Sequence, residues 1–391
     1  MNKIKKNITV DYFYRFFASF DITAAIWILY LGYKGMNLIE IGLLESIFHI
    51  TGLIFEIPTG AFADLLGRKK VIIFGRIGFL ISCIIMLFSN SFLGFAASFI
   101  TQAISYNLNS GSEEALVYDS LKEIGDEKNY TKIAGRLNLI IEIAQGLAVF
   151  IGGILSEINF SISYIVAILV GLCSLGISLK FKEIGIIEKK ERIDKVNIID
   201  HFKISFKILK NNKLLLRLLI YFPLIFTFSS TIYFYAQQYF RDLGLSKILI
   251  SIIFLINGVF SALGALISDR FEKFLKGNRY MFIPLGIGIS IILFSCLEVV
   301  LSVLMFWLLG IFTAMLYPIS SNKVNSIIPS KQRATIISID SMMFSIGMIV
   351  FFPLAGVIGE NFNLRCSFFI IGIFVLLVSF MNFYIVKKLK N

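Results

Sequence analysis

Apolar runs of about 20 residues, separated by short polar connections, fill this sequence from end to end. A run of that length folded as an α-helix crosses a hydrocarbon layer of roughly 30 Å. A bilayer core offers no water to unpaired backbone groups, so spans of this kind are helices. The composition agrees, because 57% of the residues are hydrophobic and only 16% are charged, against about a quarter in soluble domains. We therefore expect an all-α polytopic membrane protein.

Twelve transmembrane helices are predicted from these runs. The N-terminal stretch MNKIKKNITVDYFYRF lacks the short apolar core and small-residue cleavage site of a signal peptide, so the first helix is expected to be retained. The expected spans are 10–33, 39–62, 71–89, 92–118, 134–156, 160–180, 213–239, 246–268, 280–298, 299–322, 335–358 and 364–386.

The one long polar interval divides the chain into two groups of six spans. We expect an N-terminal six-helix bundle at 1–180, a cytoplasmic central loop at 181–212 and a C-terminal six-helix bundle at 213–391. Within the loop, Ile199, Phe202, Phe206 and Leu209 recur at helical spacing, which predicts an amphipathic helix at the membrane interface. A solvated linker is the alternative.

Basic residues orient the predicted helices. If the N-terminus is cytoplasmic, only four of the 37 Lys and Arg residues lie in the outer connections: Lys34, Arg241, Lys247 and Arg365. In this count Arg76 belongs to the inner 2–3 turn. This bias is the positive-inside rule, so both termini are expected in the cytoplasm and the protein in the plasma membrane. The rule also explains the net charge of +12 without nucleic acid as a partner.

A short motif suggests that the two halves repeat. Gly60, Asp64 and Arg68 follow the second span, and Ala265, Asp269 and Lys273 follow the eighth with the same relative spacing. Two parallel six-helix repeats are typical of secondary transporters.

Three stretches resemble the major facilitator superfamily. GAFADLLGRKK, which contains Gly67, is similar to the superfamily's loop 2–3 signature, and the longer pattern from Glu56 resembles drug exporters related to clostridial-type tetracycline efflux proteins. SGSEEALVYDSL and IPSKQRATIISI resemble the end of helix 4 and the 10–11 turn of that branch.

The resemblance implies a secondary transporter that works by alternating access, most simply as a proton-coupled exporter of lipophilic or cationic drugs. It also implies a cytoplasmic gate in which Asp64 faces the N-terminus of helix 11 and Arg68 pairs with Asp119. Two features depart from the antiporter pattern: the segment AQGLAVFIGG lacks a proline, and helix 4 lacks the usual arginine.

Ionisable residues inside the predicted spans are the candidates for coupling and binding, because a charge at the bilayer centre costs about 2.5–3.5 kcal/mol. A buried carboxylate can exchange a proton or balance a cationic substrate, although a static hydrogen bond between helices is the alternative for each acid. Glu45, His49 and Glu56 share one helical face. For Arg15, four residues after Asp11, we expect an internal ion pair. The candidates are Asp21, Glu142, Glu113, Glu56, His49 and Glu45.

Aromatic residues supply a possible drug site, in YFPLIFTFSSTIYFYAQQYF of the seventh span and at Trp307 and Tyr317 in the tenth; lipid-facing aromatics are the alternative. Phosphate-binding loops, catalytic clusters and metal-ligand spacings are not found in the sequence, so we expect neither an enzyme nor a cofactor, and the four cysteines are spaced singly. The expected partners are a small-molecule substrate, protons and the lipid bilayer, with the protein a monomer. Uptake or exchange of a small metabolite or lipid is the main alternative function.

Overall fold

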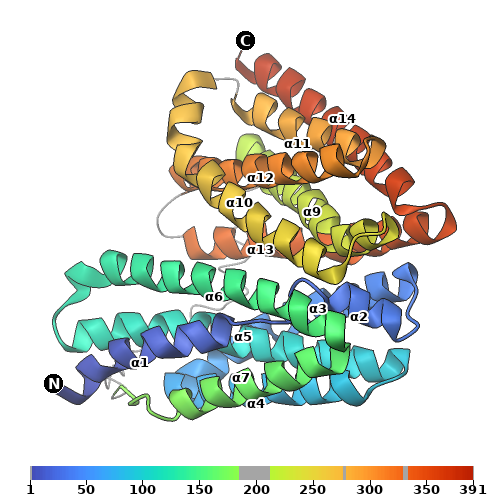
Figure 1. The fold of residues 1–391 in the computed structure, drawn as a ribbon. Coiled ribbons are helices and arrows are strands. Elements are labelled where there is room, and N and C mark those ends of the chain that lie inside the picture. The colour runs from blue at the N-terminus through green and yellow to red at the C-terminus, as the bar shows by residue number, and fades with distance from the viewer. Residues whose placement is uncertain (1, 185–211, 276–278, 329–332, 391) are drawn as a thin grey trace. The chain divides into compact units, whose positions relative to one another are not determined.

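The computed structural model describes residues 2–184, 212–275, 279–328 and 333–390, and every regular element in these ranges is helical (Figure 1). The predicted amphipathic helix at 199–209 lies outside them. The first half forms α1 (Asn2–Ser19), α2 (Trp27–Tyr33), α3 (Leu38–Leu66), α4 (Arg68–Phe88), α5 (Phe92–Glu123), the short η1 (Glu127–Asn129), α6 (Tyr130–Ile158) and α7 (Phe160–Ser178). The second half forms α9 (Lys213–Asp242), α10 (Lys247–Leu275), α11 (Arg279–Cys296), α12 (Val299–Ile327), α13 (Arg333–Asn361) and α14 (Leu364–Lys390).

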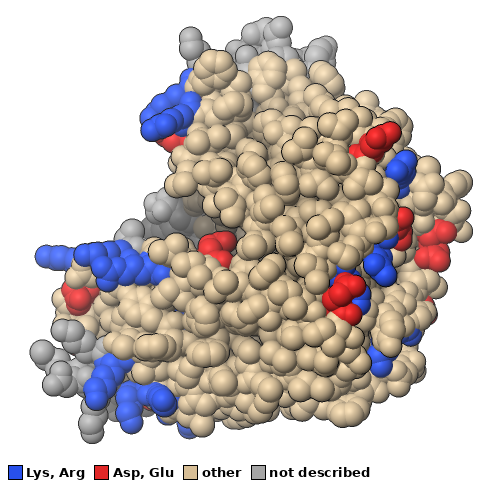
Figure 2. Space-filling view, viewed as in Figure 1, with Lys and Arg blue, Asp and Glu red and all other residues tan. Residues whose placement is uncertain are grey.

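The all-α polytopic fold is confirmed. Among the described residues, nine helices are long and apolar enough to cross a membrane: α3, α4, α6, α7, α9, α10, α12, α13 and α14. The apolar part of α11 is shorter, and α5 carries a polar stretch, SYNLNSGSEE, in its middle. Figure 2 shows that residues other than Lys, Arg, Asp and Glu cover most of the face drawn.

The first predicted span is not one helix, and the expectation of a continuous helix at 10–33 was wrong. α1 ends at Ser19 and α2 begins at Trp27. Asp21 lies in the break, where its Oδ1 accepts hydrogen bonds from the backbone N–H of Thr23 at 2.9 Å and from the Thr23 hydroxyl at 2.6 Å. Local side-chain bonds of this kind compete with helical backbone bonds, which explains the interruption.

The chain divides into two compact units. The described residues within Met1–Met36, Ile47–Glu191 and Ser246–Ile252 form the first unit, and those within Asn37–Ser46, Arg192–Leu245 and Ile253–Asn391 form the second. α3 and α10 each contribute their first turns to one unit and their remainder to the other.

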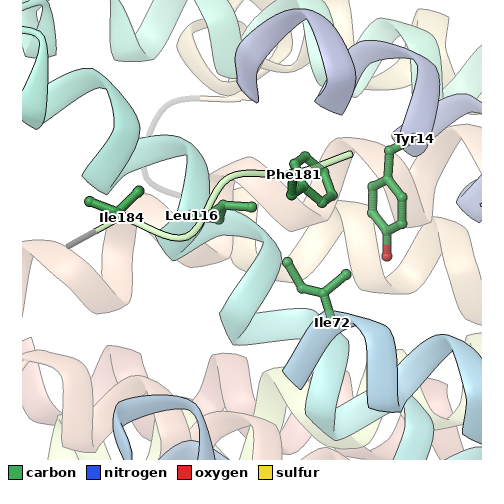
Figure 3. Packing of buried hydrophobic residues seen from close by; sticks show 5 residues of the cluster. All are labelled: Tyr14, Ile72, Leu116, Phe181 and Ile184. Carbon is green, nitrogen blue, oxygen red and sulfur yellow. The ribbon is translucent and has the colours of Figure 1, made fainter. Parts of the chain in front are cut away.

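A hydrophobic cluster holds the first unit together beside α1 (Figure 3). Tyr14 of α1, Ile72 of α4 and Leu116 of α5 are fully or almost fully buried against Phe181 and Ile184, which follow α7. The rings of Tyr14 and Phe181 meet edge to face, with centroids 5.2 Å apart. The cluster therefore joins α1, α4, α5 and the segment after α7, which are distant from one another in the sequence.

In the second unit, the first turns of α3 pack against α9 and α13. Ser46 Oγ donates to the carbonyl oxygen of Ile349 at 3.0 Å, and Tyr235 Oη donates to that of Leu38 at 3.0 Å. Gly42 permits this approach, since a Cβ there would lie 2.6 Å from the Cα of Pro353.

The corners before α3 and α10 have the same structure. In one, Gly35 N–H donates to Gly32 and Met36 N–H to Leu31; in the other, Gly244 donates to Arg241 and Leu245 to Phe240. Both glycines have positive φ, 89° and 86°, as this type of helix end requires. The shared corner is a second sign, independent of the Asp64 motif, that the halves repeat.

Carboxylates cap the two helices that follow these corners. Glu360, in the last turn of α13, accepts from the N–H of Leu38 at 2.9 Å, and Glu157, in the last turn of α6, accepts from the N–H of Lys247 at 3.1 Å. An anion is stabilised at a helix N-terminus by the unpaired N–H groups and the helix dipole.

We predict that Glu360→Ala accelerates amide hydrogen exchange in a peptide covering the start of α3 and leaves the start of α10 unchanged, and that Glu157→Ala does the reverse. Each substitution removes the acceptor of one helix only. Peptide-resolved hydrogen–deuterium exchange measures both regions in one experiment. Equal exchange in both variants and the wild type would show that the caps do not hold these helix ends.

Candidate functional site

A cluster of charged side chains lies inside the first unit. Glu113 of α5 is at its centre: Oε1 accepts from the Tyr14 hydroxyl at 2.5 Å and from Arg76 at 3.0 Å, and Oε2 accepts from Arg15 at 2.6 Å. Arg15 Nε is also 3.5 Å from Asp11 Oδ2, which is the ion pair expected from their spacing. We call Asp11, Arg15, Arg76 and Glu113 the charge cluster.

The charge cluster contains two carboxyl groups and two guanidinium groups. The side chains of Arg15, Arg76 and Glu113 are 12%, 10% and 8% exposed, so each charge is removed from water and needs an opposite charge in contact. Arg76 further donates to the carbonyl oxygen of Ala18 at 3.3 Å, beside the helix break, and its guanidinium lies 5.3 Å from the Tyr14 ring centre. The charge cluster therefore connects α1, α4 and α5.

The expectation that Arg76 belongs to the cytoplasmic 2–3 turn was wrong. Arg76 lies two turns inside α4 and is buried. The signal was available, because Arg76 is a lone charge within the apolar run 71–89 and intramembrane charges are functional candidates whatever their sign.

The other candidate acids lie in different surroundings. Glu45 is buried in the second unit, whereas His49 is half-buried and Glu56 exposed, both in the first. The expected stripe on α3 thus keeps its helical spacing but is divided between the units. Glu142, in the middle of α6, is exposed. Lipid contact would be costly for a carboxylate at that depth, so we expect Glu142 to face water.

The expected gating motif surrounds the turn between α3 and α4. Gly67 has φ 90°, and Arg68 Nε lies 3.8 Å from Asp119 Oδ2, so the ion pair expected there is present but long. Gly60 and Asp64 lie in the last turns of α3, and the Asp64 side chain is outside the described atoms. In the second unit, Lys273 Nζ pairs with Asp269 at 2.6 Å on an exposed surface.

A cavity of about 270 Å³ lies within the second unit, between α9, α10 and α12. The residues that line it recur at helical spacing on each helix, so each helix turns one face to the cavity. They are Phe226, Ser229, Ser230, Tyr233, Asn257, Ser261, Phe306, Leu309, Gly310, Thr313, Ala314 and Tyr317.

Some of the predicted aromatic candidates line this cavity and others do not. Tyr317 and two rings of the seventh span line it. Trp307 instead donates its indole N–H to the carbonyl oxygen of Ile253 at 3.0 Å and stacks on Phe260. Tyr239 donates to the carbonyl oxygen of Phe294 at 3.1 Å, a contact between helices.

The described ranges 2–184, 212–275, 279–328 and 333–390 contain no group of three His, Cys, Asp or Glu side chains placed to hold a metal ion. All four cysteines are free.

The family model described as "Major Facilitator Superfamily" matches residues 12–307 and 241–390. The chain belongs to the major facilitator superfamily. It is a secondary transporter and not an enzyme.

Two curated relatives and one solved structure illustrate the match. The uncharacterized MFS-type transporter YxaM of Bacillus subtilis is 27% identical, over 97% of this chain and 96% of its own. The inner membrane transport protein YajR of Escherichia coli is 27% identical, over 32% of this chain and 26% of its own. The crystal structure of a mutant of the nucleoside transporter NupG has a TM-score of 0.82 at 15% identity, over 97% of this chain and 98% of that one, which shows a shared fold.

We predict that Glu113→Gln destabilises the protein by about 3–5 kcal/mol, because it leaves two buried guanidinium groups with one carboxylate between them. Thermal unfolding of the purified protein in detergent measures the effect. Glu114→Gln is the matched control: its side chain is the exposed neighbour, and a change within about 0.5 kcal/mol is expected. Equal unfolding temperatures for the two variants would contradict a stabilising charge cluster.

We predict that Gly67→Ala costs about 1–2 kcal/mol, the strain of an L-residue at positive φ. The added Cβ would also lie 2.7 Å from the Glu183 carboxylate. Gly176→Ala, in α7 with open space around it, should be neutral or stabilising. Thermal unfolding compares the two, and a Gly67→Ala protein as stable as Gly176→Ala would refute the requirement for glycine.

Proposed function

We propose that this transporter is a proton-coupled exporter of lipophilic compounds that works by alternating access in the plasma membrane, with both termini cytoplasmic. The observation that carries the proposal is the aromatic cavity within the helices of the second unit, on a chain of this superfamily. Rings combined with a few polar groups suit small lipophilic molecules. The resemblance of the α3–α4 motif to drug exporters supports the direction of transport.

The first unit supplies the acids for coupling in this proposal. Glu113 already contacts two arginines and a tyrosine, so a proton or substrate would have to displace existing partners. Glu142 is exposed in mid-helix, and Asp21 lies in the break of the first span with Oδ1 bonded to Thr23. We assign proton exchange to Glu142 and Asp21.

The ion pairs at the helix ends suit a cycle that opens and closes. Arg68 and Asp119 are partly exposed and 3.8 Å apart, and a pair of this kind contributes about 0–1 kcal/mol. Such a contact can break in every transport cycle, whereas the buried charge cluster holds its three helices together throughout.

Uptake or exchange of a small metabolite is the second candidate. Its supporting observation is the group of hydroxyl and amide side chains in the cavity, which suit a solute more polar than most drugs. NupG, which shares the fold, is a nucleoside transporter, but likeness at 15% identity carries no substrate.

The test uses inverted vesicles that contain the purified protein and an imposed pH gradient, acidic inside. Export coupled to proton antiport predicts accumulation of a lipophilic compound with proton efflux reported by a dye. A proton-coupled uptake carrier would instead move the compound out of such vesicles, and no gradient-dependent movement of any compound in a broad panel would refute coupling.

We predict that Asp21→Asn or Glu142→Gln abolishes gradient-driven accumulation while leaving exchange of labelled for unlabelled compound, because a neutral amide cannot exchange a proton. Glu127→Gln, in η1 outside the predicted spans, is the control and should transport normally. Normal coupling in both Asp21→Asn and Glu142→Gln would remove these residues from the mechanism.

A further inference from the structure

The cavity between α9, α10 and α12 has no charged side chain among the twelve residues that line it. A cation placed there would meet no opposite charge, only aromatic rings and the neutral oxygens of hydroxyl and amide groups. Cation–π contacts contribute about 0.5–2 kcal/mol, whereas a charge at the bilayer centre costs about 2.5–3.5 kcal/mol. Because the cost of a buried charge exceeds the gain from cation–π contacts, the cavity favours an uncharged ligand.

Three polar atoms of the lining are buried without a hydrogen-bond partner among the described residues: Ser229 Oγ, Asn257 Oδ1 and Thr313 Oγ1. They come from three different helices, and the residues Ser229 and Asn257 are 4% and 6% exposed. Buried polar groups are nearly always hydrogen-bonded in native proteins, so three such groups around one cavity are positions that a bound ligand can satisfy. A carbonyl oxygen and two hydroxyls accept hydrogen bonds, and the hydroxyls also donate.

Four aromatic rings also line the cavity. Phe226 and Tyr317 have ring centres 6.0 Å apart, and Tyr233 lies nearly parallel to Phe306 at 6.2 Å. Flat apolar surfaces of this kind pack against a ring of the ligand. The volume of about 270 Å³ is at the low end of ligand pockets, roughly 300–1,000 Å³, and suits a molecule of metabolite size.

Gly310 gives the side chain of Asn257 room to pack against α12. A Cβ at this position would collide with Asn257 Oδ1 and lie 2.8 Å from Ser261 Oγ. The smallest side chain possible is therefore present where the cavity is most polar.

We propose that this cavity is the substrate site and that it binds an uncharged ring compound of metabolite size, which carries hydroxyl or amide groups, in preference to a cation. Asn257 is the specificity-determining residue: its carbonyl oxygen accepts from the ligand, and as a neutral side chain it gives a cation no opposite charge to offset the loss of water. The inference rests on the proposed function as a carrier and narrows its substrate class.

The experiment is isothermal titration of the full-length purified protein, without any gradient, using matched pairs of probes. Tryptophol and tryptamine share an indole ring and differ in a terminal hydroxyl or ammonium group; 2-phenylethanol and phenethylamine form a second pair. We expect the uncharged member of at least one pair to bind at least tenfold more tightly than the cation. Tighter binding of the cations, or binding of no uncharged probe, would overturn the proposal.

Three variants assign the binding to this cavity. Asn257→Ala should reduce the affinity for the uncharged probe five- to tenfold, and Gly310→Ala should abolish binding of that probe. Asn257→Asp, which changes shape little, should reverse the preference toward tryptamine. Asn382→Ala is the matched control, since Asn382 is 4% exposed and also has an unpartnered Oδ1 but lies outside the cavity, and its affinity should equal that of the wild type.

The outcomes separate this inference from the proposed function. Preferential binding of uncharged probes without gradient-driven transport would leave the cavity assignment intact and refute proton coupling. Gradient-driven transport of cations that is unaffected by the Asn257 substitutions would support proton coupling and refute the assignment of the substrate site to this cavity.

Discussion

The compensation of charge inside the membrane is the constraint on which the first unit depends. Glu113 pairs with Arg15 and Arg76, and Arg15 also lies beside Asp11. Removal of Glu113 would leave uncompensated guanidinium charges among apolar helices. Because the partners come from α1, α4 and α5, the same interactions that make the charges tolerable also fix three helices relative to one another. Tyr14 adds a bond to Glu113 and packs its ring into the adjacent hydrophobic cluster.

The two units divide the chemistry between them. The charge cluster lies inside the first unit, where the helix break also places Asp21 and α6 exposes Glu142. The cavity of the second unit is lined by aromatic, hydroxyl and amide groups. This division suits a carrier in which proton exchange and substrate recognition use different residues, so that coupling acts through conformation and not through direct competition at one carboxylate.

Much of the fold could be predicted from the sequence, because apolar runs of membrane-spanning length leave the backbone no alternative to helices. The Asp11–Arg15 and Arg68–Asp119 pairs also follow from spacing and resemblance, and the structure contains both. The break at Asp21 was missed, since it depends on local bonds to Thr23 that an apolar pattern does not reveal. The cavity was not predicted. Ser229, Asn257 and Thr313 do not form a pattern in the sequence, and only the packing of three helices brings them together.

A structure determined by electron cryomicroscopy with bound tryptophol would show where this protein holds an uncharged ring compound. We predict ligand density between α9, α10 and α12, within hydrogen-bond distance of Asn257, while Arg15 and Arg76 keep their contacts with Glu113. Density against Glu113 or Glu142 in the first unit, with the cavity unoccupied, would contradict it.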